Sequence, residues 1–168
     1  PFLELTSRQI FMRDALVRTA QPCGKEGRAV LTYFVNRLQH GDHATPYSFV
    51  TATAPPVVPY PIPPDSIVVN QWLAEDLKAK LHDQVDLTYY VLEPWRGLRE
   101  TTKRLRIAAV LPMGAPALDP ALMPPFPGMS EAENCRDWKP GIPVDLNAVR
   151  ERDEEYWDTY RGTPKAFV

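Results

Sequence analysis

The sequence is poor in the residue types on which many binding sites depend. It contains two cysteines, three histidines and eight glycines among 168 residues. Cys23 and Cys135 lie far apart, so no Cys-x-x-Cys metal motif is present. The formal net charge of −2 argues against a nucleic-acid-binding surface, because such surfaces carry a basic excess.

The chain also has no long apolar run and no familiar catalytic motif. No segment approaches the roughly 18–20 consecutive apolar residues of a membrane span, and residues 1–4 do not read as the start of a signal peptide. A Gly-x-Ser-x-Gly elbow, a Gly-rich phosphate loop and a His-Glu-x-x-His pair are all missing. The length fits a single domain that covers residues 1–168.

Proline, by contrast, is abundant, with nineteen residues. Six of them fall between Pro55 and Pro64, which predicts an extended strap over the surface. More prolines interrupt residues 112–143, where few strand patterns remain. Because proline lacks a backbone donor, we expect this long segment to be a surface loop that is mobile or in contact with a partner.

The stretch with the clearest secondary-structure signals runs from Ile67 to Leu111. The β-branched residues 67–69 predict a buried strand, and Asn70 is a strong helix N-cap. Leucines at 73, 77 and 81 then form one stripe of a short helix. From Val85 the period changes to two, which predicts a strand over 85–91 and a return strand over 105–111. The link between them, 93–103, is long for a hairpin, so we expect it to project from the sheet.

Weaker patterns fill the rest of the chain. Together they predict an α+β fold with a mixed sheet of about five or six strands, two or three packed helices and long Pro-rich loops. The expected strands are 2–5, 30–38 and 47–53, and the expected helices are 14–19, one turn at 119–123, and a final helix from its Asp145 cap to Gly162.

The order of elements in Ile67–Leu111 resembles the extracytoplasmic core domain of FtsX-like, MacB-type ABC transporter permeases. The similarity covers about a quarter of the chain, with weaker likeness in the flanks 31–51 and 153–167. Two positions depart from the family pattern. His82 precedes Asp83 where the family usually has Gly-Asp, and Ala109 stands where the return strand often has glycine.

The resemblance implies an extracytoplasmic domain at the periplasmic face of a bacterial inner membrane. Such a domain performs no chemistry and needs no cofactor or metal. Its expected partners are the rest of the permease, a cytoplasmic ATPase subunit and other extracytoplasmic proteins. The membrane helices would then lie outside this segment.

Two loops are the candidate contact surfaces for those partners. They are the link 93–103 and the Pro-rich segment 112–143. Their large apolar residues require cover from another surface unless they pack internally. The candidate contact residues are Trp95, Phe126, Met129 and Trp138.

Four other groups of residues can each be interpreted as a functional site or as ordinary structure. His40 and His43 flank a turn and resemble half of a zinc site, but a third ligand is not indicated, so a solvated hairpin turn is favoured. Cys23 and Cys135 can pair only in an oxidising compartment. The acidic run 153–155 reads as a solvated helix face. Residues 156, 157 and 160 read as core on the last helix. A small hydrolase using the two histidines and a secreted binding module stay open as alternatives.

Overall fold

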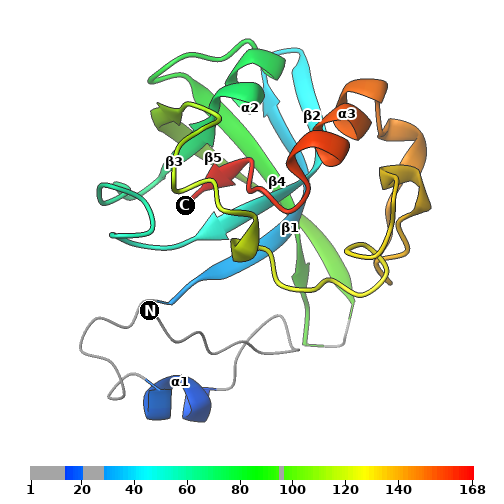
Figure 1. Cartoon of the computed structure of the whole chain (residues 1–168), viewed down its shortest axis with the longest axis horizontal. Helices are drawn as coiled ribbons and strands as arrows, with labels where there is room; N and C mark the ends of the chain where they lie inside the picture. Colours follow the sequence, from blue (N-terminus) through cyan, green and yellow to red (C-terminus); the bar gives the residue numbers. More distant parts are fainter. Residues whose placement is uncertain (1–13, 21–28, 95–96) are drawn as a thin grey trace.

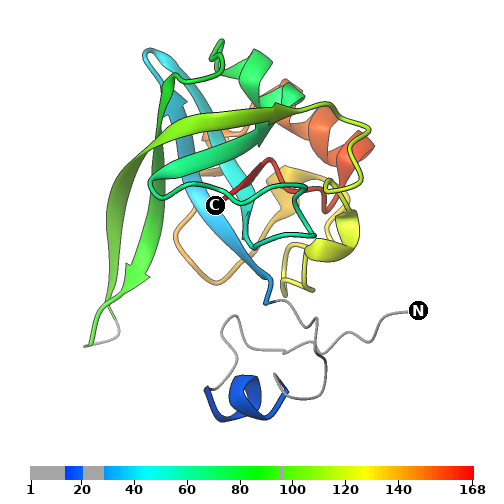
Figure 2. The same cartoon turned by 90° about the vertical axis from the view of Figure 1, so that its left-hand side faces the viewer.

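A six-stranded closed barrel forms the body of the protein. The computed structural model describes residues 14–20, 29–94 and 97–168, and the barrel strands follow the order β1-β2-β6-β3-β5-β4, with β4 pairing back to β1. Figure 1 and Figure 2 show the barrel with α3 on one flank and α1 apart from it. The predicted α+β class with a mixed sheet is confirmed, whereas closure of the sheet into a barrel was not predicted. The predicted strand 2–5 lies outside the described residues.

The first hairpin joins β1 (Leu31–His40) to β2 (His43–Ala52) in one continuous antiparallel register, from Leu31 opposite Ala52 to His40 opposite His43. Gly41 turns the chain with φ +55°, a conformation that glycine adopts without strain. The sequence predicted both strands and this turn.

Residues 55–60 form turns and bends, so the extended conformation predicted for the strap over 55–64 is wrong there. After this strap segment, β3 (Ser66–Asn70) leads directly into α2 (Gln71–Asp76). Asn70 Oδ1 accepts the backbone N–H of Leu73 at 2.8 Å, so the predicted N-cap is confirmed. The helix ends earlier than the leucine stripe suggested, because Lys78 takes a positive φ of +51°. Leu81 is therefore 51% exposed, and its placement on a buried stripe was wrong.

The strands β4 (Gln84–Leu92) and β5 (Leu98–Leu111) form one long hairpin. Their pairing continues to Leu92 opposite Leu98, so the predicted link over 93–103 shrinks to residues 93–97. Residues 99–104 are all polar and mostly exposed, so this part of the strand has no apolar alternation that would have revealed it. Figure 2 shows the hairpin extending well beyond the barrel.

The barrel is closed by β6 (Ala166–Phe167), a two-residue strand. It runs parallel to β2 and antiparallel to β3, so it fills the gap between two strands that would otherwise be edges. No periodicity marks a strand this short, and the sequence did not predict it.

The helical elements lie outside the barrel wall. They are α1 (Asp14–Ala20), α3 (Glu151–Tyr160) and the short 3₁₀ turns η2 (Pro120–Leu122), η3 (Cys135–Asp137) and η4 (Leu146–Ala148). Asp145 caps η4 through Asn147 N–H rather than opening one long helix, so the single helix predicted from 145 to 162 was wrong in its first turn. Gly162, with φ +80°, follows the end of α3 and stops the helix, as expected.

Apolar side chains gather in three clusters. The largest fills the barrel and includes Leu38, Ile67, Leu73, Leu77 and Ile107. A second, aromatic cluster lies outside β1 and β2, where Phe34 and Phe49 meet Trp138 and Trp157. The third lies beneath the strap, where Val58 contacts the outer side of β3 and β6. The strap and the Pro-rich segment thus act as covers for the outer barrel wall.

The buried position of Leu77 generates a stability prediction. Its side chain has 0% exposure in the barrel core. Leu77→Ala should lower the free energy of unfolding by about 2–5 kcal/mol, because lost contacts and a residual cavity both contribute. Leu81→Ala is the matched control and should change it by less than about 0.5 kcal/mol. Chemical denaturation measures both, and equal losses would contradict this packing.

The close approach of residues 128 and 139 generates a second prediction. A Cβ on Gly128 would lie 2.1 Å from the carbonyl oxygen of Lys139, and Gly128 has φ +79°. Gly128→Ala should therefore break the hydrogen bond from Lys139 N to Gly128 O, now 2.7 Å, and destabilise the domain by more than about 1 kcal/mol. Thermal unfolding measures the loss.

Gly114→Ala provides the control for this second prediction. Nothing lies within 4 Å of a Cβ placed on Gly114, and its φ is not positive. We expect its unfolding temperature to match that of the unaltered chain. An unfolding temperature that Gly128→Ala leaves unchanged would show that the 126–139 loop tolerates a side chain there.

Candidate functional site

Buried charges meet where α2, α3 and β6 come together. Asp76, at the end of α2, accepts a hydrogen bond from Thr45 Oγ1 at 2.5 Å. It also accepts Arg150 Nη2 at 2.6 Å and lies 3.1 Å from Arg152 Nε. Although only 7% of Asp76 is exposed, three donors surround its carboxylate, so its burial is compensated.

A second carboxylate, Asp153, lies beside the first. Its Oδ2 accepts the backbone N–H of Arg150 at 3.0 Å, which caps α3, and also accepts Arg150 Nε at 2.8 Å. Arg150 Nη2 donates to the other oxygen at 2.9 Å. These hydrogen bonds with Asp153, more than those with Asp76, raise the pKa of Arg150 above its ordinary value. One arginine thus bridges two buried carboxylates on two helices.

Lys165 approaches the same cluster from the chain segment before β6. Its Nζ lies 3.7 Å from Asp153 Oδ1, and 4.4 and 4.7 Å from the ring centres of Trp72 and Tyr156. Burial lowers the pKa of Lys165 from about 10.5 to about 8, and the neighbouring carboxylates oppose that effect. The ammonium group is therefore held by an aromatic cage as well as by a carboxylate.

Neutral hydrogen bonds complete the junction. Asn70 Nδ2 donates to Tyr156 Oη at 2.9 Å, and Tyr156 Oη donates to the carbonyl oxygen of Thr163 at 3.1 Å. Burial raises the pKa of Tyr156 well above 10, which keeps the phenol protonated. Strand β3, helix α3 and the approach to β6 are tied together by these two side chains.

One sulfur nucleophile, Cys135, lies near the buried charges of this junction. Cys135, the nearest sulfur nucleophile, is buried, and burial raises its pKa to about 12. At neutral pH its thiol is protonated, which makes it a weak nucleophile. In the described part of the chain, no group of three or more His, Cys, Asp or Glu side chains is arranged to hold a metal ion.

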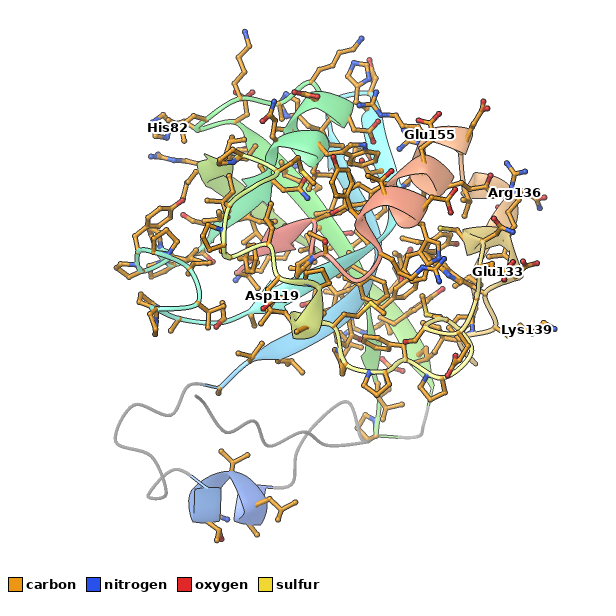
Figure 3. All side chains as sticks on the ribbon, in the orientation of Figure 1. His82, Asp119, Glu133, Arg136, Lys139 and Glu155 are labelled. Carbon is orange, nitrogen blue, oxygen red and sulfur yellow. The ribbon has the colours of Figure 1, made fainter. Side chains whose placement is uncertain are left out.

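The structure places the two histidines proposed from the sequence on either side of one hairpin turn. His40 and His43 face each other across the β1–β2 turn, and His40 Nδ1 lies 2.8 Å from the carbonyl oxygen of Gln84. Its Nε2 lies 3.7 Å from Asp83. The favoured interpretation, a hairpin turn, matches the observed geometry. His82 is exposed and points outward (Figure 3).

The acidic run was misread at its first residue. Asp153 is buried in the ion cluster, whereas Glu155 is exposed and points away from the barrel (Figure 3). Tyr156 and Trp157 are buried core residues of α3, as predicted. The helix thus places one carboxylate of the run inward because Asp153 shares a face with Trp157 and Tyr156.

The candidate contact residues of the Pro-rich segment turn inward. Met129 and Trp138 are buried in the aromatic cluster, and Phe126 is half-buried against Phe49. Met129 and Trp138 therefore follow the internal-packing alternative and need no cover from another surface in this structure. Contact between this segment and a partner stays a prediction. Trp95 and Cys23 lie outside the described residues, so a contact at Trp95 and a Cys23–Cys135 pair also stay predictions.

Sequence reasoning missed the principal members of the junction. No site role was predicted from the sequence for Asp76, Arg150 or Lys165. One signal was present, because Lys165 is the only charged residue among the six from Thr163 to Val168. A cation inside an otherwise uncharged closing segment requires a carboxylate or aromatic partner elsewhere.

Comparisons with known proteins do not assign this chain to a family. A scan against protein-family models finds no match, and a search of curated proteins finds none either. No helix in the described ranges is long and apolar enough to cross a membrane. The functional proposal therefore depends on the sequence pattern and on the arrangement of side chains in this structure.

The depressed pKa of Lys165 predicts a specific pH dependence of stability. Between pH 8 and 10.5 the unfolded chain holds the Lys165 proton more fully than the folded chain does. The Lys165 contribution to the free energy of unfolding should therefore rise with pH in this window, by at most about 1.4 kcal/mol per pH unit. Below pH 8 both states are protonated and the contribution is constant.

Denaturation of the unaltered chain and of Lys165→Met at several pH values measures this effect. Their difference in unfolding free energy should be flat from pH 6 to 7.5 and should then change with the stated sign. Using the difference removes most of the opposing effect of Cys135, whose thiol favours the folded state less as pH rises above 9. A difference that stays constant up to pH 10 would contradict the buried, hard-to-protonate amine.

Proposed function

We propose that this chain is the extracytoplasmic domain of an ABC exporter-type permease. In this function it binds a partner or substrate outside the membrane and moves when a cytoplasmic subunit hydrolyses ATP. The observation that carries the proposal is the pattern of Ile67–Leu111, which resembles the MacB-type core domain. The elements of that pattern occur in the expected order as β3, α2, β4 and β5.

The chain enters and leaves the barrel at neighbouring positions, which supports the proposal. Leu31 begins β1 opposite Ala52, while Val168 accepts a backbone hydrogen bond from Thr53 at 3.2 Å and donates one to Thr51 O at 3.0 Å. The first and last barrel strands thus flank the same end of β2. A domain inserted into a longer membrane-bound chain needs its two ends close together, because both must return to the same neighbour.

The projecting hairpin offers a surface for a partner. Leu92 and Leu98 are paired at its tip and are 67% and 41% exposed. Exposed leucines on a narrow arm have no packing role within the barrel. The shorter link 93–97 thus keeps the contact function that we assigned to the 93–103 loop.

The packing at the junction supports a role in motion rather than chemistry. Arg150 connects α3 to Asp76 of α2, and Lys165 connects the segment before β6 to Asp153 of α3, so a displacement of β6 would act on the buried carboxylates. A rigid body with charged internal ties transmits displacement better than a loosely packed one. The hydrolase alternative lacks such support, because His40 is held by the backbone of Gln84.

Cysteine labelling of the whole protein in cells tests the location. With Cys23 replaced by serine, Thr159→Cys places a thiol on the exposed side of α3. We expect a membrane-impermeant maleimide to label it in intact spheroplasts. Cys135, which is buried and has its pKa raised to about 12, is the internal control and should stay unlabelled until the protein is denatured.

Two outcomes of this experiment would contradict the proposal. Labelling of Thr159→Cys only after the membrane is permeabilised would place the domain on the cytoplasmic side. Recovery of the whole protein from the soluble fraction would favour the secreted binding module instead. Co-purification with an ATPase subunit from detergent extracts tests the partner separately.

A further inference from the structure

Two polar groups without partners belong to residues of one small cavity. In the part of the chain that the structure describes, three buried side-chain atoms lack a hydrogen-bond partner: Asn36 Oδ1, Ser48 Oγ and Trp138 Nε1. Ser48 and Trp138 both line a cavity of about 20 Å³ between β2, η3 and α3. Buried polar groups without partners are rare in folded proteins, so two at one cavity require an explanation.

A third polar group at this cavity is under-bonded. Lys165 lines it too, and its ammonium has three protons to donate. The nearest carboxylate oxygen, on Asp153, is 3.7 Å away, beyond hydrogen-bond length. The rings of Trp72 and Tyr156 stabilise the charge but supply no lone pair. The cavity is therefore lined by hydrogen-bond donors that lack an acceptor among the described residues.

The size of the cavity selects the ligand. A cavity must have a volume of at least about 10–15 Å³ to hold one water molecule. The observed value of about 20 Å³ suffices for one water and for no organic molecule. Water accepts two hydrogen bonds and donates two, which matches a site lined by an indole N–H, an ammonium and a hydroxyl.

We propose that this cavity is a binding site for one internal water molecule, held by Trp138, Lys165 and Ser48. The water accepts from Trp138 Nε1 and Lys165 Nζ and donates to Ser48 Oγ. It thereby links η3, the approach to β6 and β2 in the same way that Arg150 links α2 and α3. The site is independent of the proposed transport function, because it rests only on the packing of these residues.

Two tryptophans in the same aromatic cluster provide a matched test. The indole N–H of Trp157 donates to the carbonyl oxygen of Ala132 at 3.2 Å, whereas that of Trp138 has no protein acceptor. In nuclear magnetic resonance spectra of the ¹⁵N-labelled domain, the Trp138 indole proton should show a direct cross-peak with water of the sign expected for a long-lived bound molecule. The Trp157 indole proton should show none.

Variants separate hydration from folding. Ser48→Val fills space at the cavity and removes the hydroxyl, so the Trp138 water cross-peak should disappear while the rest of the spectrum is retained. Ser48→Ala keeps the space and removes one partner, so the cross-peak should weaken. If Ser48→Val does not fold, Ser48→Ala alone decides, because it adds no atoms.

A crystal structure distinguishes the possible occupants. One ordered water within hydrogen-bond distance of Trp138 Nε1 and of Lys165 Nζ or Ser48 Oγ would agree with the proposal. An anomalous signal at the site after bromide soaking would show that a halide, not water, occupies the cavity, and would overturn the proposal. An empty cavity in the crystal, together with no water cross-peak at Trp138, would also overturn it.

Discussion

The fold depends on the pairing of two residues, Ala166 and Phe167. Without them β2 and β3 would each present an unpaired row of backbone donors and acceptors. Backbone bonds on either side of the strand extend the seam, from Lys165 N to Phe49 O at 2.9 Å and from Asn70 N to Lys165 O at 2.9 Å. Both side chains are fully buried, on opposite sides of the barrel wall. The closing strand thus completes the hydrogen-bonding of the sheet and joins two of its apolar clusters.

The buried ions are arranged around that seam. Asp76 and Asp153 are each held by several donors, so neither carboxylate is left without compensation for its lost hydration. Lys165 brings a third cation from the segment that forms the closing strand. Removing one member would leave its partners buried with fewer donors or charge contacts, and losing one partner of a buried ion pair costs more than the intact pair contributes. The cluster therefore ties the segment that leads into β6 to the buried carboxylate of α3.

Local signals predicted those parts of the fold that local physics determines. Asn70 as a cap, the Gly41 turn and the alternation of 85–91 each depend on neighbours a few residues away, and each was predicted correctly. The failures concern tertiary constraints. The polar face of residues 99–104 hid half of β5, and β6 is too short to have a period. The ion cluster joins residues 74 to 89 positions apart, Asp76 to Arg150 and Lys165, and no single-sequence pattern connects them.

The order of the closed sheet has a consequence for synthesis. The closing strand is made after every other barrel strand, so in a growing chain one edge of β2 and one edge of β3 stay unpaired until residues 166 and 167 have left the ribosome. Contacts between distant positions form slowly, and exposed strand edges are prone to associate between chains. Ribosomes that stall before this point would release a chain whose barrel is open on one side. Completion of the barrel wall thus depends on residues 166 and 167, which form the closing strand.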